Sequence, residues 1–169
     1  MEAKNALKQF EGIGGPPIVE PCSTFDLLQG DVYSEIPFCY IDEDGDISTI
    51  MQKAQLLSNT CDASREDGRL IFAAVRPLKD LEENPTMVES IVSNKKFGAL
   101  YLPGNPLRSE YVDLQLLNSM SHSTFCGLQS AQKVNRIATL SNVGYYLFIC
   151  KMTIFFLRPE DVDVNSQRS

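Results

Sequence analysis

The chain has 169 residues, of which 43% are hydrophobic and 22% are charged, and its formal net charge at pH 7 is −7. These values are typical of one compact globular domain and argue against disorder over most of the chain. The acidic balance disfavours a nucleic-acid ligand, because the average field repels phosphates unless basic residues gather on one face.

Five cysteines and a single histidine limit the chemistry of the chain. The cysteines have no Cys-x-x-Cys spacing and the N-terminus lacks the layout of a signal peptide, so a reduced, cytoplasmic protein is expected. A zinc site would have to combine His122 with scattered thiols, so neither a metal nor another cofactor is expected. The longest apolar stretch, residues 143–157, contains Lys151 and is shorter than the roughly 20 residues that span a bilayer, so no membrane contact is expected.

The first predicted element is a flexible N-terminal arm, residues 1–24, where glycines and prolines prevent a long regular structure. A single domain is expected over residues 25–160. A disordered tail is expected over residues 161–169.

The next predicted element is a strand over residues 31–38, which leads into an acidic turn with Asp44-Gly45 at its tip. This dipeptide is preferred where a positive φ is required, so a hairpin or a longer loop is predicted. A calcium loop is disfavoured, because the glycine comes too early in the loop for an EF-hand and position twelve would be Lys53. A solvated turn is the favoured interpretation.

Two apolar segments, residues 51–57 and 69–78, are predicted to be core strands joined by a polar connection. The charged segment that follows contains Pro85. Residues 86–92 are predicted to form a short inserted helix with this proline near its start.

Two further strands are predicted over residues 97–103 and 110–120, and the second shows a regular alternation of apolar and polar side chains. A sixth short strand is predicted over residues 123–128. The last predicted element is a helix capped by Ser141 and ended by Arg158-Pro159. Its wide apolar surface favours contact with a second copy of the chain.

The order of these elements resembles the MazF/PemK-type toxin family, whose fold is an SH3-like barrel with a C-terminal helix. The resemblance is carried by the segments GDVYSEIPF (30–38), KAQLLSN (53–59), LIFAAVRPL (70–78), YVDLQLLNSM (111–120) and RIATLSNVGYYL (136–147). It implies an α+β, mainly β fold: an SH3-like small β-barrel with a short inserted helix and a C-terminal helix. It also implies a bacterial or phage toxin–antitoxin setting and a homodimer.

Members of this family that cleave RNA use an arginine just before the second strand and a hydroxyl residue just after the third. Attack by a ribose 2′-OH needs a proton acceptor, a proton donor and positive charge beside the phosphate. At these positions the chain has Lys53 at best and the segment Leu78-Lys79-Asp80, so the catalytic pair is not reproduced. The favoured function is therefore a binding or interaction module. The alternative is a metal-independent endoribonuclease in which Lys53, Arg76 or Lys79 replaces the arginine, although a lysine lacks the bidentate fork of an arginine.

The segment at residues 56–69 places a cysteine beside hydroxyl, acidic and basic residues, and it has three interpretations. Cys61 as a nucleophile would need a base, and the single histidine, His122, lies far along the chain. A structural role is favoured, with Cys61 as a small buried apolar residue and with Ser58 and Asp62 bonded to backbone groups.

The third interpretation is a ligand-binding loop in which Thr60, Asp62 and Arg65 face a pocket at the barrel mouth, with Arg76 as a companion. It adds a third candidate function, a sensor of a small molecule or a nucleotide. Together with Lys53, these residues form the predicted ligand-binding set, and no catalytic residue is assigned. The expected partners are a second copy and another protein, whereas the net charge disfavours RNA.

Overall fold

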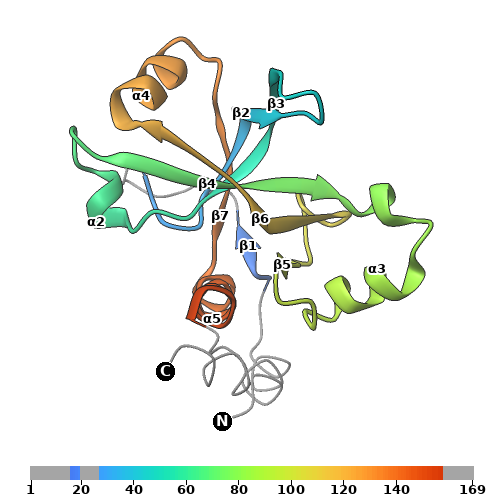
Figure 1. Cartoon of the computed structure of the whole chain (residues 1–169). Helices are drawn as coiled ribbons and strands as arrows, with labels where there is room; N and C mark the ends of the chain where they lie inside the picture. Colours follow the sequence, from blue (N-terminus) through green and yellow to red (C-terminus); the bar gives the residue numbers. More distant parts are fainter. Residues whose placement is uncertain (1–15, 20–26, 158–169) are drawn as a thin grey trace, which may run out of the picture.

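The computed structural model describes residues 16–19 and 27–157, and Figure 1 shows how their elements are arranged. The elements in chain order are β1 (Ile18–Val19), β2 (Val32–Ile41), β3 (Ile47–Leu56), α2 (Thr60–Ala63), β4 (Arg69–Pro77), the 3-10 helix η1 (Leu78–Leu81), α3 (Pro85–Val92), β5 (Ala99–Leu100), β6 (Glu110–Ser121), α4 (His122–Ser130), β7 (Arg136–Leu140) and α5 (Asn142–Leu157). The described strands pair antiparallel in a seven-stranded sheet with the order β1-β7-β2-β3-β4-β6-β5. The α+β, mainly β class is therefore confirmed.

The predicted N-terminal arm and C-terminal tail lie mostly outside the described residues. Inside the range of the arm, Ile18 and Val19 form β1, which pairs with β7. The Ile18 side chain is buried in the same cluster as Phe148 of α5. Gly144 of α5 makes room for this segment, because a Cβ at that position would overlap the backbone oxygen of Pro17. Residues 16–19 are thus held by both the sheet and α5.

The turn between β2 and β3 forms the predicted hairpin. Gly45 has a φ of 86°, a conformation that glycine adopts without a steric penalty. The carboxylate of Asp42 accepts hydrogen bonds from the backbone N–H groups of Asp44 (3.1 Å) and Asp46 (2.8 Å). The exposed acidic turn is therefore closed by its own hydrogen bonds.

The sheet buries apolar side chains on both faces, because successive residues of a strand point to opposite sides. On one face the rings of Tyr33, Phe72 and Phe125 pack together, with 5.1 Å between the centroids of Tyr33 and Phe125. Phe125 belongs to α4, so we call this side the α4 face. On the other side, Ala73 packs in a cluster with Phe148 of α5, and we call it the α5 face.

The sheet is strongly curved. The side-chain amide of Asn118 on β6 donates a hydrogen bond to the backbone oxygen of Pro37 on β2, although β3 and β4 lie between these strands in the sheet. A register shift between Ala73 and Ala74, which pair with Leu117 and Asp113, adds a bulge to β6. The sheet nevertheless ends at β1 and β5 and is not closed into a barrel, so the SH3-like barrel stays a prediction.

The strand predicted over residues 123–128 is wrong, because this segment forms the helix α4. The hydroxyl of Ser121 accepts a hydrogen bond from the N–H of Thr124 and caps the helix. Phe125 and Leu128 then reach the α4 face together at a spacing of three residues. A short apolar run does not distinguish a strand from a buried helix, which explains the error.

The predicted helices α3 and α5 are present, whereas α2 and η1 were not predicted as helices. Asn84 caps α3 by accepting from the N–H of Met87, and Pro85 occupies the first turn. Ser141 caps α5 by accepting from the N–H of Gly144, while the predicted helix end at Arg158-Pro159 lies outside the described residues. Four strands differ from the predictions. β1 falls within the predicted arm, and β3 begins at Ile47 and not near residue 51. β5 is limited to Ala99–Leu100, and β7 was not anticipated as a strand.

Candidate ligand-binding site

A groove lies beside the end of β4, between the segment from η1 to α3 and the segment that leads into β6. It has a volume of about 690 Å³, which is within the range of known ligand sites of about 300–1,000 Å³. Its lining residues are Pro77, Leu78, Lys79, Glu82, Val88, Asn105, Pro106, Arg108, Ser109 and Glu110. Apolar and charged side chains therefore share one concave surface.

The positive and negative charges that line the groove do not cancel. Glu110 forms an ion pair with Lys53 of β3, with 2.5 Å between Nζ and Oε2. Lys79 and Arg108 are exposed, and neither has an ion-pair partner among the residues that the structure describes. Glu82 is the remaining acid of the lining. Because Lys53 neutralises Glu110, the groove has a positive excess within a chain of net negative charge.

Backbone hydrogen bonds hold the two walls of the groove together. The N–H of Leu78 donates to the carbonyl of Ser109 at 2.9 Å, so η1 begins directly against the segment before β6. The hydroxyl of Tyr101 donates to the carbonyl of Arg108 at 3.0 Å, and the side chain of Asn94 bonds both backbone groups of Tyr101. The position of Arg108 is therefore tied to the C-terminal end of α3.

A buried lysine supports the same end of α3. Lys151 of α5 is 1% exposed, and its Nζ donates to the carbonyl of Asn94 at 2.9 Å. Burial lowers the pKa of Lys151 from 10.5 to about 8, because a charged amine loses its hydration inside the protein. The Lys151 amine therefore links α5 to the C-terminal end of α3, although its burial disfavours the protonated form.

Of the predicted ligand-binding residues, Lys53 lies beside the groove and Arg76 lies on the other side of the sheet. Ala54 and Ala74 are register partners on the α4 face. Lys53 directly precedes Ala54 and therefore points to the α5 face, whereas Arg76 follows Ala74 by two residues and points to the α4 face.

Arg76 sits in a charged cluster of its own. Its guanidinium lies 3.8 Å from the carboxylate of Asp113, and its register partner is Tyr111. Burial raises the pKa of Tyr111 above 10.0; Arg76 opposes the rise, while Asp113 and Asp80 add to it. Arg76, Tyr111 and Asp113 are not among the residues that line the groove.

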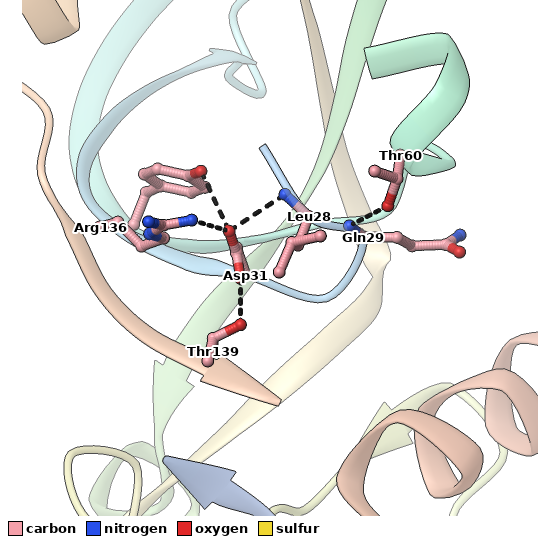
Figure 2. Close-up of polar contacts among 7 residues, drawn as sticks. Leu28, Gln29, Asp31, Thr60, Arg136 and Thr139 are labelled. Carbon is pink, nitrogen blue, oxygen red and sulfur yellow. Dashed lines mark hydrogen bonds and ion pairs between the residues drawn. The ribbon is translucent and has the colours of Figure 1, made fainter. Parts of the chain in front are cut away.

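The other predicted residues, Thr60, Asp62 and Arg65, belong to α2 and the turn after it. Figure 1 shows α2 and α3 at opposite sides of the molecule. Asp62 and Arg65 form an exposed pair at 3.8 Å, which contributes little to stability. Thr60 accepts a hydrogen bond from the backbone N–H of Gln29 at 3.0 Å (Figure 2). The predicted set therefore does not converge on one site.

The chemistry around Cys61 also differs from the favoured interpretation. Cys61 is exposed and not buried. The histidine contacts another thiol, since the Sγ of Cys126 lies 3.5 Å from Nε2 of His122. Ser58 does bond to the backbone, because its hydroxyl accepts from the N–H of Ile71 at 2.8 Å. The structural role predicted for Ser58 is confirmed, whereas the buried position predicted for Cys61 is wrong.

A fully buried carboxylate joins the start of β2 to β7 (Figure 2). Asp31 accepts hydrogen bonds from the backbone N–H of Leu28, from the hydroxyls of Tyr33 and Thr139, and from the guanidinium of Arg136 at 3.0 Å. A buried carboxylate is stable in a protein when donors surround it in this way. Asp31 therefore positions the start of β2 against β7.

Sequence reasoning did not identify Arg108, Glu110 or Glu82 as site residues, because no local motif marks them. No family model, curated protein or solved structure matches the chain. Among the described residues, no group of three or more His, Cys, Asp or Glu side chains is placed to hold a metal ion. No helix within residues 16–19 and 27–157 has the length and apolarity needed to cross a membrane.

Proposed function

We propose that the chain is a protein-interaction module whose groove binds an acidic and apolar segment of a partner protein. The observation that carries this proposal is the composition of the groove. The exposed cations Lys79 and Arg108 share it with the apolar side chains Leu78 and Val88, while Lys53 neutralises Glu110.

This composition suits a peptide with alternating carboxylates and apolar side chains. The guanidinium of Arg108 offers paired donors to a carboxylate, and Lys79 adds a second positive charge. The apolar part of the lining excludes water from bound side chains, which is the usual role of apolar surface in a small site. Net affinity comes from a few such contacts and not from the area alone.

The proposed scaffold is a divergent relative of the MazF/PemK-type toxins in which the SH3-like barrel has opened. The order of the elements supports this kinship, and so does the bond between Asn118 and Pro37 that draws β6 towards β2. The same proposal assigns the protein to a bacterium or a phage and to the bacterial cytoplasm. It also includes a toxin–antitoxin setting and a homodimer. The sensor that would use Thr60, Asp62 and Arg65 has weaker support, because Asp62 and Arg65 already pair with each other.

A second candidate function, a metal-independent endoribonuclease, is favoured by one feature of the same groove. The carboxylate of Glu110 is a proton acceptor beside three cations, Lys53, Lys79 and Arg108. In such an enzyme Glu110 would take the proton of a ribose 2′-OH, whose oxygen attacks the phosphorus. The P–O5′ bond would then break while the ammonium of Lys79 gives a proton to the leaving O5′, and a 2′,3′-cyclic phosphate and a 5′-hydroxyl would result. The cations would stabilise the charge of the transition state.

Fluorescence anisotropy with a labelled peptide of alternating leucine and glutamate tests the interaction module. The variant Lys79→Glu/Arg108→Glu should bind this peptide about tenfold more weakly or worse, because two charge-assisted contacts are lost. The control Lys95→Glu/Lys133→Glu has the same change in net charge at exposed positions outside the groove and should bind normally. Equal binding by both variants would remove the groove from the proposal.

Incubation with single-stranded RNA in EDTA tests the enzyme. Cleavage that is lost in Glu110→Gln and Lys53→Ala but kept in Arg76→Ala would establish the second candidate, because Arg76 lies on the opposite face of the sheet. Absence of cleavage together with specific peptide binding would establish the first.

A further inference from the structure

The outer edge of β3 is open over more than half of the strand. β3 pairs with β4 only through Ala54–Leu56, whereas its pairing with β2 extends to the hairpin turn. Among the strands that the structure describes, residues 47–53 therefore pair with β2 alone, and we call their other side the free β3 edge. A row of unpaired backbone groups of this kind is a template for another strand.

The residues along this edge are unusually apolar for an exposed hairpin. The exposed fractions of the side chains are 76% for Ile41, 75% for Ile47, 52% for Ile50 and 45% for Met51. Ile41 and Ile47 are register partners at the end of the hairpin, and Met51 points to the same face as Ile47, so these three residues form one apolar surface. Ile50 points to the opposite face. Single exposed apolar residues are ordinary, but a contiguous group marks a surface that is covered in use.

The free β3 edge also lacks the features that normally block strand addition. Residues 47–53 contain no proline or glycine, and their one charged side chain, Lys53, is held by Glu110. Edge strands are commonly protected by proline or by a charged side chain that approaching strands must bury. The outer edge of β2 differs, because Pro37 has no N–H and its carbonyl is occupied by Asn118. Within the described part of the chain, the β3 side of the hairpin is therefore open from residue 47 to residue 53.

The charge of the adjacent turn indicates the kind of partner. The turn exposes the carboxylates of Asp42, Glu43, Asp44 and Asp46 directly beside Ile41 and Ile47. In the described part of the chain, no lysine or arginine lies within ion-pair distance of these carboxylates. An approaching strand with basic side chains would meet a complementary field, and an acidic strand would be repelled.

We propose that the free β3 edge binds an extended segment of a partner protein in which apolar residues alternate with lysine or arginine. The segment adds as a further strand, so its backbone bonds to residues 47–53 and its apolar side chains cover Ile47 and Met51. Its basic side chains face the acidic turn. This surface is independent of the groove, which carries the opposite charge and is lined by other residues.

The test uses the full chain and a labelled peptide, Lys-Val-Lys-Val-Lys-Val-Lys, as the probe. The peptide should bind with a Kd below about 1 mM. It should protect from hydrogen exchange the alternate backbone amides of residues 47–53 that point away from β2. Two further peptides, N-methylated at all lysines or at all valines, keep the charge but lose alternate N–H groups. At least one of them should lose binding, because one set of N–H groups faces β3. Equal binding by all three peptides would overturn strand addition.

Two charge variants with the same change in net charge complete the test. Glu43→Lys/Asp44→Lys should weaken binding of the parent peptide at least about tenfold, since it reverses the field beside the edge. Glu83→Lys/Glu89→Lys changes exposed acids at α3 and should leave binding within about twofold. Protection that maps to any other segment, or protection of residues 47–53 by self-association without peptide, would overturn the proposed partner. Binding of the basic peptide should persist in Lys79→Glu/Arg108→Glu, which separates this surface from the groove.

Discussion

Asn118 and Pro37 are joined by a hydrogen bond of 2.6 Å from a side-chain amide to a backbone carbonyl, although two strands separate them in the sheet. The contact closes the gap between β6 and β2 over the rings of Tyr33 and Phe72. It explains how an open sheet encloses a core on its α4 face. It also occupies the carbonyl of the one proline in β2, which leaves β3 as the open side of the hairpin.

We predict that Asn118→Ala lowers the free energy of unfolding by about 1–2 kcal/mol, because the carbonyl of Pro37 loses its donor. Urea denaturation followed by circular dichroism measures this change. Thr153→Ala on the exposed side of α5 is a control that should be nearly neutral. If the two variants unfold at the same urea concentration, the contact does not contribute to the curvature.

The buried carboxylate of Asp31 predicts a strong coupling with Arg136. Asp31→Asn should cost about 3–5 kcal/mol, because it removes the fully buried negative charge that pairs with the guanidinium of Arg136. Arg136→Met in the same chain should recover part of that loss. A double-mutant cycle by urea denaturation gives the coupling directly, and additive effects of the two substitutions would contradict the arrangement.

Two glycines in helices should respond oppositely to alanine. Gly144→Ala should separate residues 16–19 from α5, because the new Cβ would overlap the backbone oxygen of Pro17. Hydrogen exchange at the N–H of Ser141, which donates to the same oxygen, should become faster. Gly127→Ala in α4 meets no atom within 4 Å and should stabilise the chain by up to about 1 kcal/mol. Unchanged exchange at Ser141 in Gly144→Ala would show that this close packing is absent.

The lowered pKa of Lys151 predicts a pH dependence with a definite sign. In the folded chain the amine loses its proton near pH 8, whereas in the unfolded chain it does so near 10.5. Between these values the unfolded state binds more protons, so the free energy of unfolding rises with pH. The total rise caused by Lys151 is about 3 kcal/mol. The destabilising effect is complete below pH 8 and disappears above pH 10.5.

Urea denaturation of the native chain and of Lys151→Met between pH 7 and pH 10 isolates the contribution of Lys151 to the free energy of unfolding. The native chain should gain stability relative to the variant as the pH rises, since methionine has no proton to lose. Lys133→Met, at an exposed position, is the control and should follow the native chain. Parallel curves for the native chain and Lys151→Met would mean that the amine is hydrated in the folded state.

Features that depend on neighbouring residues could be predicted from the sequence. The glycine turn at Asp44-Gly45, the cap of α3 at Asn84 and the cap of α5 at Ser141 each have a local signal, and each is present. The strand β7 and the helix α4 were missed because a short apolar segment fits either conformation until its packing partner is known.

The candidate site depends on contacts across the chain and could not be predicted in the same way. Lys53 was selected from a family position, but its partner Glu110 lies 57 residues away, and no motif links the two. Arg76 and Lys53 were placed in one set, but the alternation of side chains along paired strands puts them on opposite faces. The register of the sheet therefore decides which charges meet.

Chemical-shift mapping by NMR tests whether the groove binds an acidic and apolar segment. On titration with the alternating leucine and glutamate peptide, we predict that the amides of Leu78, Lys79, Arg108 and Ser109 shift together and saturate, while those of residues 47–53 stay unchanged. Shifts confined to other parts of the chain, or a saturating response of these amides to the lysine and valine peptide instead, would contradict the account.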